Sequence, residues 1–179
     1  GLERVRTAFA TAATRAVRLG LDALEVHAAH GYLLHQFLSP LSNRRDDGYG
    51  GLLANRMRFP LEVLEAVSAV VPPTTVLGMR ISATDWVEGG WTVDDSIEYV
   101  RAAQALGIDY VCVSSAGLTA QAQVPISPGY QVPAAARIRA APTAFDPGAQ
   151  CFFLICFFAD LTKRPNALSF FLLSTYDIA

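Results

Sequence analysis

The sequence has few charged residues and almost no net charge. Charged residues make up 17% of the 179 residues, hydrophobic residues make up 52%, and the formal net charge is −2. This composition is typical of a globular domain and excludes a disordered chain. It gives no indication of a nucleic-acid partner or of binding to an anionic membrane surface.

Cysteines and long apolar runs are also scarce. The three cysteines, Cys112, Cys151 and Cys156, fit neither a metal-binding spacing nor an even-numbered disulfide framework. We therefore expect a reducing, cytoplasmic setting. The most apolar run, residues 151–159, is too short to cross a bilayer. We expect no membrane association.

Segments with helical and strand periodicity alternate along the chain. Helices are predicted over 2–19, 53–70, 92–106 and 133–140, and strands over 22–28, 75–81 and 109–115. Such alternation predicts right-handed βαβ units and a parallel sheet. A (β/α)₈ barrel and a doubly wound open sheet both fit. The dinucleotide signature G-x-G-x-x-G is absent after every predicted strand, which favours the barrel.

All three histidines lie within nine residues at the end of the first predicted strand. They are His27, His30 and His35, with Tyr32 between them. Imidazole and phenol groups donate hydrogen bonds to carbonyl oxygens and transfer protons near neutral pH. We therefore predict a functional site here. Two alternatives stay open: a loop whose polar rings bond to nearby backbone, and a three-histidine zinc site, which the lack of ligands after the other strands disfavours.

Polar residues also end the other two predicted strands, with Arg80 on the second and serines 114–115 on the third. In a barrel, active sites gather at these carboxyl ends. Period-two alternation puts Glu25 and Arg80 on the inward faces of neighbouring strands. We therefore expect the two charges to lie close together, with Gly78 leaving space beneath Arg80.

Five stretches of the chain form a specific signature: LEVHAAHGYLLHQFLSPLSNRRDDGYGG, ANRMRFPLEV, RISATDW, VSSAG and PGYQVP. Together they resemble the Old Yellow Enzyme family of FMN-dependent NAD(P)H oxidoreductases, and especially its bacterial, thermophilic-like ene-reductase branch. The resemblance covers residues 1–141. The most specific part is H-x-x-H-G-Y followed by N-R-R-x-D-x-Y-G-G. The family fold is a (β/α)₈ TIM barrel, in agreement with the predicted elements.

The resemblance implies a role for each candidate residue. His27 and His30 would bind the carbonyl oxygen of an α,β-unsaturated carbonyl substrate, and Tyr32 would be the proton donor. Arg80, together with His27, would contact FMN. The cofactors would be FMN and NAD(P)H, the reaction would be reduction of a C=C bond, and homo-oligomers are common in the family.

The resemblance ends near residue 141. We therefore expect a partial TIM-barrel flavin oxidoreductase domain over 1–141, with three to four βα units, and a divergent tail over 142–179. By resemblance, the chain is an internal fragment from the middle of the barrel, with two open sheet edges. Leu52 is a smaller departure, because the family usually has a helix-capping serine there.

Three functions follow from these features. The first is a piece of an FMN-dependent ene-reductase that acts on a small enone-type molecule. The second is a truncated, non-catalytic product with an incomplete flavin site. The third, disfavoured by the lack of metal ligands on several strands, is a metal-dependent barrel hydrolase.

Overall fold

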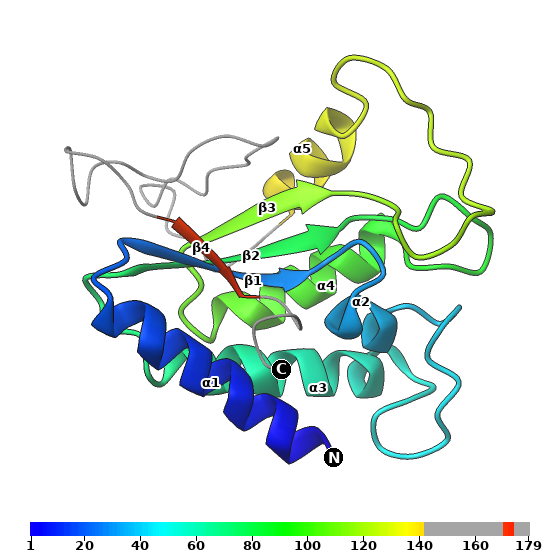
Figure 1. Ribbon diagram of the computed structural model, residues 1–179. Helices are drawn as coiled ribbons and strands as arrows, with labels where there is room; N and C mark the ends of the chain where they lie inside the picture. The colour runs from blue at the N-terminus through cyan, green and yellow to red at the C-terminus, as the bar shows by residue number, and fades with distance from the viewer. Residues whose placement is uncertain (142–169, 174–179) are drawn as a thin grey trace.

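A computed structural model describes residues 1–141 and 170–173 of the chain. Its helices and strands follow one another in the order α1 (Leu2–Arg18), β1 (Ala23–Ala28), α2 (Leu33–Leu38), α3 (Leu53–Ser68), β2 (Val76–Ser82), α4 (Val93–Gln104), β3 (Tyr110–Ser114), α5 (Val132–Ala140) and β4 (Phe170–Leu173) (Figure 1). Every helix and strand predicted over residues 1–141 is present. The short helix α2 is an addition, because the sequence predicts a loop there.

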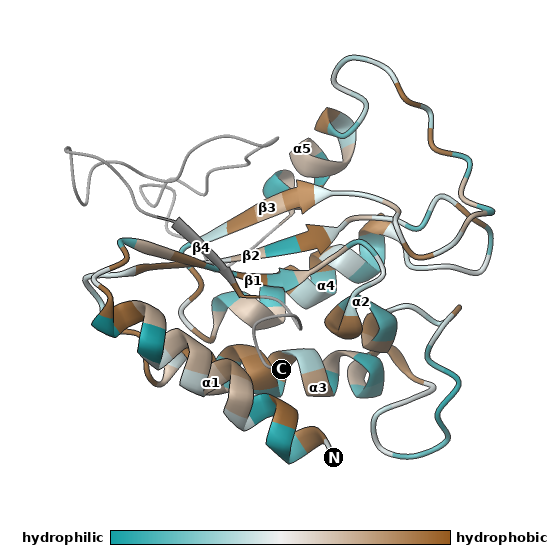
Figure 2. Ribbon diagram, in the orientation of Figure 1, coloured by the Kyte–Doolittle hydropathy of each residue, from teal (hydrophilic) through white to brown (hydrophobic). Residues whose placement is uncertain are grey.

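The helices form where the sequence places apolar residues on one side. In α1, Phe9, Ala12, Ala13 and Ala16 are buried, and Figure 2 shows the alternation of brown and teal along the helix. In α4, the Thr92 side chain accepts a hydrogen bond from the Asp95 backbone N–H, and the Asp95 side chain accepts one from the Thr92 backbone N–H, which completes a capping box. None of the helices in the described residues is long and apolar enough to cross a membrane.

The buried face of α3 matches only in part the face that the helical spacing predicts, which is Leu61, Leu64, Val67 and Val70 or Val71. Phe59, Val63, Leu64 and Val67 are buried, but Val70 is 39% exposed. The reason is that α3 ends at Ser68, so Val70 no longer follows the helical repeat. Leu64 and Val67 are therefore confirmed, and Leu61 and Val71 are partly buried against the core. Phe59 and Val63 are buried although they were not predicted.

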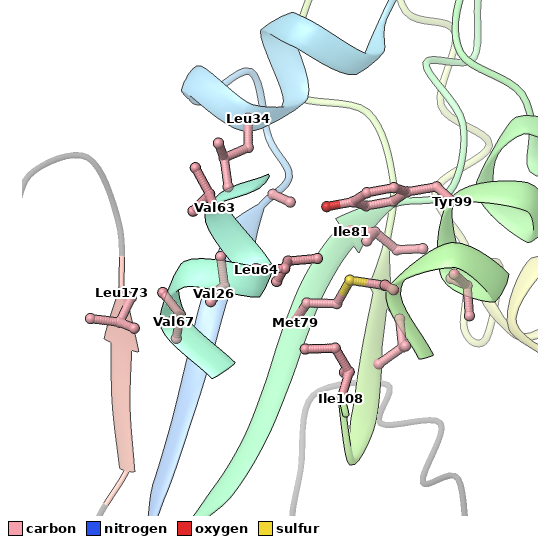
Figure 3. Close-up of a cluster of buried hydrophobic side chains, with 14 of the residues drawn as sticks. Val26, Leu34, Val63, Leu64, Val67, Met79, Ile81, Tyr99, Ile108 and Leu173 are labelled. Carbon is pink, nitrogen blue, oxygen red and sulfur yellow. The ribbon is translucent and has the colours of Figure 1, made fainter. Parts of the chain in front are cut away.

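The strands form one parallel sheet in the order β3-β2-β1-β4. One face of the sheet packs against the helices in a single apolar core, to which Val26, Met79 and Val111 contribute (Figure 3). Core residues of α1, α2, α3, α4 and α5 all belong to this same cluster. A doubly wound sheet would divide its helices between two faces. Helices on one face identify the described residues as part of a barrel wall.

The strand β4 changes one expectation about the sheet. Phe170–Leu173 pairs in parallel with β1, and Leu173 is fully buried in the main core. The free edge predicted beside β1 is therefore occupied, whereas no described strand lies beyond β3. Residues 142–169 and 174–179, which make up most of the predicted divergent tail, lie outside the described residues.

The amino end of α3 lacks a side-chain cap, because the N-cap residue is Leu52, which is 76% exposed. Its backbone has φ −59° and ψ 147°, a conformation that serine adopts without strain. We expect Leu52→Ser to raise the free energy of unfolding by about 1 kcal/mol. Leu52→Ala is the matched control, because it removes the same apolar surface without adding a cap. Urea unfolding of both variants checks the prediction, and equal stability of the two would contradict it.

Candidate functional site

The inner face of the sheet carries the predicted charged pair. The register of β1 with β2 pairs Glu25 with Gly78 and His27 with Arg80, all four on the face that points away from the main core. Nε of Arg80 donates a hydrogen bond to Oε1 of Glu25 over 2.7 Å. Glu25 is 1% exposed, and the side chain of Arg80 is 23% exposed. The predicted proximity of the two charges is confirmed.

Tyr110 on β3 completes this cluster. Its hydroxyl donates to Oε2 of Glu25 over 3.0 Å, so each carboxylate oxygen has a partner. Burial, followed by the charge of Glu25, raises the pKa of the Tyr110 phenol. A Cβ added at Gly78 would lie 2.1 Å from the Tyr110 ring. The space left by the missing side chain of Gly78 is therefore filled by the Tyr110 ring. The prediction that Gly78 leaves space beneath Arg80 is corrected accordingly.

Tyr110 was missed in the sequence, although a signal for it exists. It opens β3, and the register pairs it with Gly78. The alternation that places Arg80 on the inner face therefore places this tyrosine there too. A phenol that shares a face with a buried carboxylate is a natural hydrogen-bond donor to it.

His27, His30 and Tyr32 come together at the end of β1. The ring centroids of His27 and His30 are 5.3 Å apart, and those of His27 and Tyr32 are 4.8 Å apart. Burial, followed by the charges of His30, Arg80 and His35, lowers the pKa of His27 to about 4. Burial and the charges of Arg80 and His35 also lower the pKa of His30. Both imidazoles are therefore neutral at pH 7.

The turn after β1 holds His30 in a left-handed conformation with φ 56°. Its backbone N–H donates to the Ser82 hydroxyl over 3.0 Å, and its Nε2 lies 2.6 Å from the Ser114 hydroxyl. The turn also presses against the loop after β3. A Cβ on Gly31 would lie 2.5 Å from the Gly117 carbonyl oxygen, so only glycine fits there. Three strand ends therefore fix His30.

His35 contacts the backbone of the turn after β1 and a carboxylate in the loop after β2. Its Nδ1 accepts a hydrogen bond from the Gly31 backbone, and its Nε2 lies 3.0 Å from Oδ1 of Asp85. Nδ1 is therefore hydrogen-bonded within the protein, and Nε2 makes a close polar contact with a carboxylate. Among the described residues, no three His, Cys, Asp or Glu side chains gather in a way that would hold a metal ion. The described geometry therefore gives the three-histidine zinc alternative no support.

A cavity of about 600 Å³ lies beside this turn, and its lining includes Gly31, Gln36, Gly117 and Leu118. None of the four predicted site residues lines it. The predicted residues belong to the inner face of the sheet, and the cavity belongs to the loops above it.

The lowered pKa of His27 predicts a pH dependence of folding. Between its ordinary value of 6.5 and about 4, the unfolded chain binds a proton that the folded chain does not bind. Stability therefore falls as the pH falls through this window, by on the order of 3 kcal/mol. Urea unfolding at pH 7 and pH 4.5 measures this loss, which should be smaller in His27→Asn. An equal loss in the variant and the unaltered chain would show that His27 is not its source.

Comparison with known proteins identifies relatives of this chain. Residues 2–139 match the NADH:flavin oxidoreductase / NADH oxidase family. The chain is 48% identical over 138 residues to the NADPH dehydrogenase of Geobacillus thermodenitrificans, covering 77% of this chain and 40% of that protein. The chain therefore spans well under half the length of this relative.

Two solved structures share the fold. A 2-naphthoyl-CoA reductase complex superposes with a TM-score of 0.73 at 30% identity, covering 84% of this chain and 22% of that one. An old yellow enzyme homologue from Zymomonas mobilis superposes with a TM-score of 0.56 at 28% identity, covering 63% and 32%. The resemblance seen in the motifs is confirmed, and the chain belongs to the NADH:flavin oxidoreductase / NADH oxidase family.

Proposed function

We propose that the protein is an FMN-dependent oxidoreductase that uses NAD(P)H to reduce the C=C bond of α,β-unsaturated carbonyl compounds. One observation carries the proposal: two imidazoles, a phenol and a guanidinium gather at the carboxyl ends of β1 and β2. These groups match the needs of such a reaction, which are a polarised carbonyl, a proton donor and a positive charge beside an electron-rich ring. We also propose a cytoplasmic setting, because the three cysteines of the sequence form no even-numbered disulfide framework.

Arg80 and His27 are the residues that we propose to contact FMN. Glu25 fixes the Nε side of the Arg80 guanidinium, which holds a permanent positive charge at the end of β2. Nδ1 of His27 is buried and has no hydrogen-bond partner in the described part of the chain. A polar ligand on this face would satisfy that nitrogen. Bound FMN would supply hydride-transfer chemistry, which side chains lack.

His27 and His30 are the proposed carbonyl ligands, and Tyr32 is the proposed proton donor. A neutral imidazole keeps one N–H, so each histidine is able to donate a hydrogen bond without adding charge beside Arg80. The Tyr32 ring lies beside the His27 ring, which places a phenol next to the proposed carbonyl site. A phenol in this position is suited to deliver a proton to the α-carbon.

A second candidate is a non-catalytic product with an incomplete flavin site. The observation that favours it is β4, which pairs with the edge of β1. In a (β/α)₈ barrel, that edge belongs to the strand that precedes β1. Under this proposal, residues 1–141 form the partial barrel domain and the tail from residue 142 supplies a substitute strand.

Tyr32→Phe tests the proposed reaction in a polypeptide that also supplies the remaining barrel strands. We expect reduction of the alkene to slow by about 10²- to 10⁴-fold, because the proton donor is lost. Reduction of the flavin by NAD(P)H should be nearly unchanged. Stopped-flow measurement of the two half-reactions separates these effects.

Tyr49→Phe is the matched control, because its hydroxyl lies 3.4 Å from Glu62, on the helical side of the protein. An equal loss of both half-reactions in Tyr32→Phe would remove Tyr32 from its proposed role.

The chain of 179 residues by itself should not form a stable complex with FMN. A closed barrel needs eight strands and roughly 250 residues, and the described sheet has four strands. Titration of the purified chain with FMN, followed by flavin fluorescence and sedimentation, checks this expectation. A monomer that unfolds cooperatively and binds FMN at micromolar concentration would overturn it and exclude the second candidate.

A further inference from the structure

His35 is a buried histidine that the proposed reaction does not use. It lies on α2 and its side chain is 0% exposed. Its Nδ1 accepts a hydrogen bond from the Gly31 backbone over 3.0 Å, so this nitrogen carries no proton. An imidazole with a bare Nδ1 carries its proton on Nε2, which here lies 3.0 Å from Oδ1 of Asp85. The two contacts select one tautomer and one ring orientation.

Asp85 is fixed in turn by the loop between β2 and α4. Its Oδ2 accepts hydrogen bonds from the Ser39 hydroxyl over 2.6 Å and from the Trp91 backbone over 2.8 Å. Burial alone would raise the pKa of Asp85, but the close polar contact with His35 and the hydrogen bonds from Ser39 and Trp91 outweigh burial and lower it. The carboxylate is therefore charged at pH 7: Oδ2 accepts both of these hydrogen bonds, and Oδ1 faces Nε2 of His35 at 3.0 Å, a close polar contact that is not aligned as a hydrogen bond.

The backbone held by His35 is the turn that carries the proposed catalytic groups. His30 and Gly31 adopt consecutive left-handed conformations, with φ 56° and φ 76°. This conformation is costly for His30, which has a Cβ, so it persists only where neighbouring groups hold it. Ser82 binds the N–H of His30, and His35 binds the N–H of Gly31, the next one along the chain.

We propose that His35 and Asp85 are positioning residues that hold the turn of residues 30–32, and with it His30 and Tyr32, in place for the reaction. The catalytic consequence of this inference rests on the proposed function. The contacts that run from Asp85 through His35 to the Gly31 N–H, called the latch below, do not depend on it. A carboxylate on the β2 loop orients an imidazole on α2, and that imidazole binds the backbone between the two reacting side chains. Removing either partner releases the Gly31 N–H and frees the turn.

Nuclear magnetic resonance of the 179-residue chain tests the latch without cofactor or substrate. The ¹⁵N shifts of His35 should show a bare Nδ1 and a protonated Nε2. In Asp85→Asn and His35→Gln, hydrogen exchange at the Gly31 amide should accelerate about tenfold or more, while the Val26 and Met79 amides stay protected. Asp47→Asn is the matched control, because its carboxylate is exposed and bonds only within its own loop.

Ser39→Ala covers the case in which the stronger variants do not fold, because it removes one of the two bonds to Oδ2 of Asp85. It should accelerate exchange at Gly31 a few-fold. A protonated Nδ1 on His35, or unchanged exchange at Gly31 in every variant that folds, would overturn the latch.

The positioning role is tested in the FMN-loaded protein with the remaining barrel strands present. Asp85→Asn and His35→Gln should slow alkene reduction by about tenfold or more and leave flavin reduction by NAD(P)H within about twofold. An equal loss in both half-reactions would reduce the pair to a structural role and overturn the inference. If the unaltered protein reduces no enone, the proposed function is wrong. Hydrogen exchange at the Gly31 amide then still tests whether His35 and Asp85 hold the turn.

Discussion

The parallel register of β1 with β2 is the constraint on which the candidate site depends. It pairs Glu25 with Gly78 and His27 with Arg80. Side chains alternate between the faces of a strand, so a slip of one residue would turn these polar groups into the apolar core. The register therefore determines both which residues pack against the helices and which residues face the barrel interior.

Glu25 shows how the interior face accommodates charge. A buried carboxylate is costly unless it is paired and hydrogen-bonded. Arg80 and Tyr110 supply one bond to each of its oxygens, and Gly78 makes room for the tyrosine ring. The cluster joins three neighbouring strands. It also fixes the Nε side of Arg80, so the remaining guanidinium presents its charge in a defined direction at the strand end.

Most of the fold follows from local patterns. The repeat of apolar residues predicts α1, α3 and α4, and short apolar runs between turn residues predict β1, β2 and β3, because both signals arise within a few turns or residues of chain. The helix α2 was missed because it has six residues in a segment rich in turn formers. The strand β4 was missed because its four residues gain their order by pairing with β1, which lies far away in the sequence.

Within the candidate site, the sequence by itself determined which chemical groups stand at the strand ends and which share a face. It indicated the cluster of His27, His30 and Tyr32 and the proximity of Glu25 to Arg80, because alternation and strand order are local rules. These rules say nothing about the rings of His30 and His35, which lie in and beyond a turn whose direction depends on two left-handed residues.

Only the tertiary structure decided where those rings point. Ser114, which is 84 residues away in the sequence, lies within hydrogen-bond distance of His30. Asp85, in the loop that follows β2, contacts His35. The physical reason is that the backbone of the turn at residues 30–32 packs directly against the backbone at Gly117, which restricts where the side chains of the turn point. This packing exists only after β1, β2 and β3 have assembled.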